Sequence, residues 1–114
     1  MLGGIFMNTQ ILEQMIQHVK TTHEAKLAEK EALKKRVLEI SAWQNLSQFA
    51  GQQHLLSNDT TPFRQRFQNV FNVDLKELEQ EQSEIYGKIA ELKGDIYSLS
   101  QLLAALEIQL KQTE

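Results

Sequence analysis

The sequence predicts an all-α protein: a long antiparallel helical hairpin of the coiled-coil type, with a short helix at its turn, that assembles as a dimeric helical bundle. Three observations predict it. A heptad pattern of apolar residues fills the last third of the chain, a long stretch near the start lacks proline, and residues that favour helix dominate throughout. The 114 residues include one proline and five glycines, with 41% hydrophobic and 24% charged residues, which is typical of one folded domain.

The heptad pattern predicts a long helix over 75–112. Its apolar positions recur alternately three and four residues apart, with Gln82 as the one polar member. A period of 3.5 residues keeps one side of a helix against a partner only if the helices supercoil. Asp74 and Glu77 are spaced as an N-cap and its capping-box partner at the start of this helix. The apolar positions are Leu75, Leu78, Ile85, Ile89, Leu92, Ile96, Leu99, Leu103, Leu106 and Leu110.

A loop over 57–61 and a short helix over 62–71 precede the long helix. The loop is rich in Ser, Asn, Asp and Thr, whose side chains bond their own backbone in turns. Thr61 followed by Pro62 is typical of an N-cap and a first helical residue. Three aromatic residues then share one side of the short helix, either as a plug that closes the hairpin or as a docking patch for another protein. They are Phe63, Phe67 and Phe71.

A first long helix is predicted from residue 8 or 9 to about Ala50, or over 8–56 if Gly51 is tolerated inside it. At about 1.5 Å per residue, the helix to Ala50 and the C-terminal one each run roughly 60 Å, which favours antiparallel pairing along their lengths. The turn then sets the register and places Gln44 opposite Gln82. Such a polar layer costs stability but penalises slipped pairings, although a solvated Gln82 is an equally good interpretation.

The first helix does not offer one continuous apolar side. Its first frame contains Leu33, Val37 and Ile40. Extended backwards by heptads, this frame places Lys30, Lys26 and His23 opposite Ile96, Leu99 and Leu103. One solution is a local shift of register onto a second frame of smaller or apolar residues. That frame contains Ile11, Met15, His18, Thr22, Ala25 and Ala32.

The other solution is a further partner for the C-terminal helix, whose apolar side is widened by Leu102, Ala105 and Ile108. A side this broad is typical of a bundle core. We therefore expect a homodimer, or a groove that receives a helix of another protein, unless residues 5–7 fold back and cover it. The predicted interaction residues are Ile96, Leu99, Leu102, Leu103, Leu106 and Leu110, with Phe63, Phe67 and Phe71 second.

A cluster of cations on the first helix is the only candidate nucleic-acid surface. Residues 1–73 carry a net charge of +2 and residues 74–114 carry −5. Glutamates interrupt the cationic cluster and no aromatic residue is placed to stack bases, so a solvated face that attracts the acidic helix is the stronger interpretation. The cluster consists of Lys26, Lys30, Lys34, Lys35 and Arg36.

Catalytic motifs are missing from the sequence. There is no cysteine, and His18, His23 and His54 have no glutamate three positions before them, as carboxylate-bridged metal sites in bundles require. No metal, cofactor or enzyme activity is expected. The apolar start of the chain is too short for a signal peptide or a membrane span, which favours a cytoplasmic protein. The expected function is a non-enzymatic adaptor, chaperone or structural component, with accessory nucleic-acid binding as the alternative.

Overall fold

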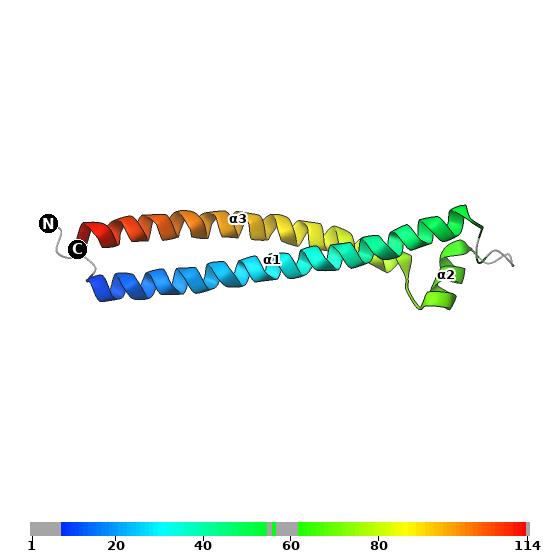
Figure 1. The fold of residues 1–114 in the computed structure, drawn as a ribbon, viewed down its shortest axis with the longest axis horizontal. Coiled ribbons are helices and arrows are strands. Elements are labelled where there is room, and N and C mark those ends of the chain that lie inside the picture. Colours follow the sequence, from blue (N-terminus) through cyan, green and yellow to red (C-terminus); the bar gives the residue numbers. More distant parts are fainter. Residues whose placement is uncertain (1–7, 55, 57–61, 114) are drawn as a thin grey trace. The chain divides into compact units, whose positions relative to one another are not determined.

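The computed structural model describes residues 8–54, 56 and 62–113. Over these residues the chain forms three helices and no strand: α1 (Thr9–Gln52), α2 (Phe63–Phe71) and α3 (Leu75–Thr113). Helices α1 and α3 pack against each other as a hairpin and α2 lies between them in the sequence (Figure 1), so the predicted all-α hairpin is confirmed. The loop predicted over 57–61 and the covering segment at residues 5–7 lie outside the described residues.

The helix boundaries follow from local capping. The Oδ1 atom of Asn8 accepts a hydrogen bond of 2.9 Å from the backbone N–H of Ile11, which fixes the start of α1. The helix continues through Gly51 and ends at Gln52, two residues beyond the nearer predicted end and short of Leu56. His54 and Leu56 have φ of 55° and 62°, a left-handed backbone that no α-helix can contain.

Helix α2 begins one residue later than predicted. Pro62 is the N-cap, with an extended ψ of 143°, and the helix starts at Phe63. The carbonyl of Pro62 accepts the first helical bonds, from the N–H groups of Gln65 and Arg66. Asn72 ends α2 in a left-handed conformation with φ of 56°, a role for which asparagine is suited because its short polar side chain tolerates this region.

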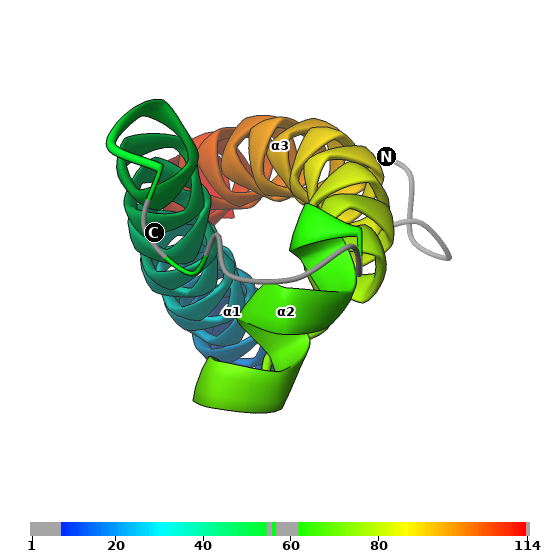
Figure 2. The same cartoon turned by 90° about the vertical axis from the view of Figure 1, so that its right-hand side faces the viewer.

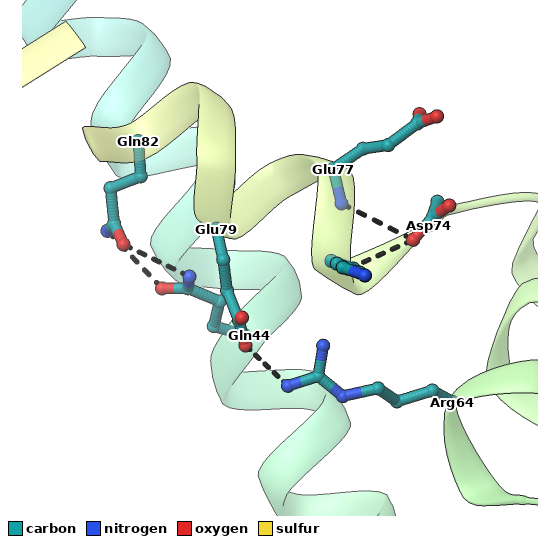
Figure 3. Close-up of polar contacts among 7 residues, drawn as sticks. Gln44, Arg64, Asp74, Glu77, Glu79 and Gln82 are labelled. Carbon is teal, nitrogen blue, oxygen red and sulfur yellow. Dashed lines mark hydrogen bonds and ion pairs between the residues drawn. The ribbon is translucent and has the colours of Figure 1, made fainter. Parts of the chain in front are cut away.

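The N-cap predicted for α3 is confirmed. The Oδ1 atom of Asp74 accepts the backbone N–H groups of Lys76 at 3.0 Å and Glu77 at 3.3 Å. Figure 3 shows these two bonds, and it shows the Glu77 side chain extending away from Asp74, so the backbone of Glu77 makes the capping contact. The helix then runs from Leu75 to Thr113, one residue beyond the predicted end.

The described chain divides into two compact units, and each long helix contributes a segment to both. The central unit is Ala32–Ile89, and the terminal unit combines Met1–Glu31 with Ala90–Glu114. The expectation of a single folding domain stays a prediction.

The central unit has a core built from all three helices, and Figure 2 shows α2 beside both α1 and α3. Phe67 of α2 and Ile40 of α1 are completely buried. Half-buried residues, among them Leu33, Val37 and Trp43, pack around this centre. The buried residues, called the central cluster below, are Ile40, Phe67, Leu75, Leu78, Ile85 and Ile89.

The terminal unit has a smaller core made by α1 and α3 alone. Four buried aliphatic residues form one cluster there with three half-buried leucines, and none of the described members of this cluster is aromatic. Each buried aliphatic side chain contributes about 1.5–3 kcal/mol to stability. This cluster has fewer buried residues than the central cluster, so it contributes less stability. The core of this unit, called the terminal cluster, consists of Leu12, Ile16, Val19 and Leu106 with Leu99, Leu103 and Leu110.

The predicted shift of register in α1 is wrong. Ile11 and Met15, members of the second frame, are 47% and 37% exposed, whereas Leu12, Ile16 and Val19 of the first frame are buried. The first frame therefore continues to the start of the helix. These three residues pack with the leucines of α3 in one cluster.

Polar residues of the first frame avoid burial by reaching the edge of the coil. His23 lies beside Ser100, with Nε2 at 3.1 Å from the hydroxyl, and Lys26 reaches a carboxylate oxygen of Asp95 at 3.6 Å. Each of these side chains thus bonds a residue about one helical turn from the α3 position predicted to lie opposite it, Leu103 for His23 and Leu99 for Lys26. Long side chains of this kind bury their stems and keep their polar ends in water, so the frame needs no shift.

Candidate interaction surfaces

The residues predicted for self-association on α3 lie mostly on the side that packs against α1. Leu106 is buried, and Ile96 and the other leucines of α3 in the terminal cluster are half-buried. Leu102 is the exception, with 48% of its surface exposed, and Ile108 is more exposed still. Self-association through these residues of α3 stays a prediction. The apolar surface exposed for it includes Leu102 and Ile108. The leucines that pack against α1 are Leu99, Leu103, Leu106 and Leu110.

The three phenylalanines of α2 belong to one aromatic stack. Phe67 is completely buried, and its ring centre lies 4.7 Å from that of Phe71 and 6.0 Å from that of Phe63. Trp43 of α1 meets Phe67 edge to face, with 6.3 Å between ring centres. These contacts support a plug, because the rings contact one another and the coil, while docking of another protein at the half-buried Phe63 and Phe71 stays a prediction.

The predicted polar layer is present in the central unit. The amide of Gln44 donates to Gln82 at 3.2 Å, and the amide of Gln82 donates back to Gln44 at 3.3 Å (Figure 3). Each side-chain amide therefore donates one hydrogen bond to the other and accepts one from it. This reciprocal pair fits only one alignment of the two segments, which supports the register inferred from the turn.

The cationic cluster of α1 is occupied in part by carboxylates of the chain itself. Arg36 donates to both oxygens of Glu81, from Nε at 2.6 Å and from Nη2 at 2.8 Å, and to Glu39 from Nη1 at 2.9 Å. The bonds to Glu81 and then Glu39 raise the pKa of Arg36, and the bond from Arg36 lowers the pKa of Glu81. Lys26 pairs with Asp95.

The remaining members of the cluster are more weakly placed for binding phosphate. Lys30 is half-buried, while Lys34 and Lys35 are exposed on α1. A phosphate-binding face needs several cations that are free to neutralise an external backbone. Since Arg36 and Lys26 are engaged by carboxylates, the arrangement supports charge pairing between helices.

A shallow pocket in the central unit lies between the three helices. It has a volume of about 280 Å³, and an ion pair of 2.6 Å joins Arg64 of α2 to Glu79 of α3 at its wall (Figure 3). Both charged side chains are more than half exposed. The pocket is small for a drug-sized ligand and its charged groups already neutralise each other. It is lined by Gln44, Ser47, Gln48, Phe63, Arg64, Leu75 and Glu79.

Over the described residues, no group of three His, Asp or Glu side chains is arranged to hold a metal ion. His18 is exposed, His23 bonds Ser100, and His54 lies in the left-handed turn after α1. Within the same residues, no helix carries an apolar stretch long enough to cross a membrane. The sequence matches no protein-family model, and comparisons with curated proteins and with solved structures give no match.

An exposed apolar stripe on α1 was missed in the sequence. Within the central unit, Leu38 is 70% exposed, Phe49 55% and Leu46 37%, and the small residue Ala42 is exposed between them. At about 100° per residue, these four positions fall within about 80° of the helix circumference. Ile40, which is completely buried, points roughly the opposite way. We call Leu38, Ala42, Leu46 and Phe49 the outer stripe.

The signal for the outer stripe was present in the spacing of 4, 4 and 3 residues. The two apolar frames considered for α1 were both sought on the side that meets α3, and neither contains these residues. A helix with apolar residues on two opposite sides can use one side for its core and expose the other. The tertiary structure separates the two sets, because Ile40 faces the central cluster while the outer stripe faces solvent.

Proposed function

We propose that this chain is a non-enzymatic protein–protein interaction module, a small coiled-coil adaptor, chaperone or structural component of a larger assembly. The outer stripe carries the proposal. Apolar side chains at spacings of three and four residues on an exposed helix side are what a partner helix packs against. The other side of α1 already has its partners in α2 and α3, so the outer stripe is available for a second protein.

The terminal unit also has exposed apolar residues that could contact another protein. Leu102 and Ile108 of α3 are exposed, as are Ile11 and Met15 of α1. Leu102 and Ile108 are the exposed part of the predicted apolar side of α3. Nucleic-acid binding is the weaker proposal, because the best-placed cation, Arg36, is held by two carboxylates.

Site-specific photo-crosslinking tests the interaction proposal. A photoreactive phenylalanine analogue replaces Leu38 in the full chain, expressed in the cells that produce it, and Tyr86 is the matched control. Both residues are exposed apolar residues of the central unit, but Tyr86 belongs to α3. We expect discrete covalent adducts from position 38, identified by mass spectrometry, and few from position 86. Equal labelling at both positions, or none at 38, contradicts the proposal.

A further inference from the structure

We infer that the outer stripe binds a second copy of this chain, with the two α1 helices antiparallel and Ala42 on the two-fold axis. The inference rests on the proposed function and names the partner of the same surface. Its basis is the symmetry of the stripe, in which Leu38 and Leu46 each lie four residues from Ala42. A two-fold interface requires such self-complementarity, because residue i must meet residue j of the other copy and the reverse.

The small side chain of Ala42 suits the position at the centre. It is exposed, and at the axis it faces its own counterpart, where a short side chain lets two helix backbones approach closely. The larger side chains then interlock on both sides of the axis, with Leu38 of each copy beside Leu46 of the other. In this arrangement three exposed apolar side chains of each copy leave water together.

Charge selects the antiparallel orientation. A parallel pair would bring Lys34 and Lys35 of both copies together and would bring Glu39 next to its counterpart. In the antiparallel pair Lys35 lies seven residues from the axis on one side, and Phe49 lies seven residues from it on the other. Each Lys35 therefore reaches the ring of Phe49 in the second copy, a cation–π contact.

Cysteine cross-linking tests this geometry directly, since the chain contains no cysteine. A disulfide needs Cα atoms within about 7 Å, a separation that only a residue on the axis has from its own counterpart. We expect Ala42→Cys to form covalent dimers under mild oxidation, several-fold more than Ser83→Cys on the exposed side of α3. Similar yields from the two variants overturn the inference.

Two further variants test the orientation. Two Leu38 residues of an antiparallel pair lie about 12 Å apart along the axis, at about 1.5 Å per residue, so Leu38→Cys alone should not cross-link. Mixing it with Leu46→Cys should produce a mixed disulfide. Homodimers of Leu38→Cys without the mixed product indicate parallel pairing and refute the antiparallel interface.

Light scattering on the unmodified chain completes the test. The mass should rise with concentration from 13.1 kDa toward twice that value, and Leu38→Glu with Leu46→Glu should hold it at 13.1 kDa. Tyr86→Glu is the matched control and should leave the dimer intact, with circular dichroism checking helicity in each variant. A monomer at all concentrations refutes self-pairing, and if photo-crosslinks at position 38 still reach another protein, the interaction function survives alone.

Discussion

The central and terminal units use the same two helices but differ in what holds those helices together. In the central unit a third helix adds an aromatic plug, and the amide pair Gln44–Gln82 and the Arg36–Glu81 ion pair join α1 to α3. Among the described residues of the terminal unit, the core cluster is entirely aliphatic. A coiled-coil segment with few buried layers is only weakly stable without a further element, and α2 supplies that element at one end.

The difference predicts that the two units open separately. Fraying costs least where few apolar groups are buried and most of the backbone borders water. Hydrogen exchange should therefore be faster over residues 9–31 and 90–113 than over the paired helices of the central unit.

The largest effect is expected from Phe67→Ala, which removes the centre of the aromatic plug. Phe67 is completely buried, and truncations of this kind cost about 3–5 kcal/mol in free energy of unfolding. Urea denaturation followed by circular dichroism measures the loss. Val70→Ala on the exposed side of the same helix is the control and should change stability little. Equal losses from the two variants contradict the plug.

Leu12→Ala should produce the next largest effect, and a local one. Leu12 is completely buried in the terminal cluster, and the substitution removes about 2–4 kcal/mol of burial. Hydrogen exchange should accelerate in the terminal unit while protection of the central unit is retained. Ile11→Ala, at a neighbouring exposed position, is the matched control. A uniform acceleration through both units shows instead that the chain unfolds as one.

Replacing Gln82 measures how much the Gln44–Gln82 pair contributes to the stability of the central unit. Gln82→Leu leaves the amide of Gln44 without its reciprocal partner in a half-buried site and should destabilise the chain by about 1 kcal/mol. The double variant with Gln44→Leu should recover that loss, because two apolar residues replace two matched polar ones. A double variant less stable than either single one argues that the pair contributes net stability.

The smallest effect concerns the ion pair between Arg36 and Glu81 at acidic pH. The guanidinium lowers the pKa of Glu81 below its ordinary value of 4.5, so the unfolded chain binds the proton more readily than the folded one. The stabilisation is complete above pH 4.5 and is lost as the pH falls through the folded-state pKa. Glu81→Gln should therefore flatten the stability profile between about pH 5 and pH 3. An unchanged acid slope contradicts the role of the pair.

The sequence alone was enough to predict the helices, because helix propensity, capping residues and the heptad period act over a few neighbouring positions. Asp74 was recognised as the N-cap of α3, and the Gln44–Gln82 pair followed from the turn. The ends of α1 and α2 were less predictable, since the left-handed conformation of His54 and the extended ψ of Pro62 depend on how the chain must turn.

The tertiary structure decided which apolar residues are used and which remain exposed. Periodicity places Leu38 and Ile40 on opposite sides of one helix, but it does not say which side meets α2 and α3. Likewise, the length and flexibility of Lys26 let a charged residue occupy the predicted frame at its edge, where a rule based on residue type alone had suggested a slip. Burial is a property of three packed helices, so which apolar side of α1 stays exposed is decided only when they pack.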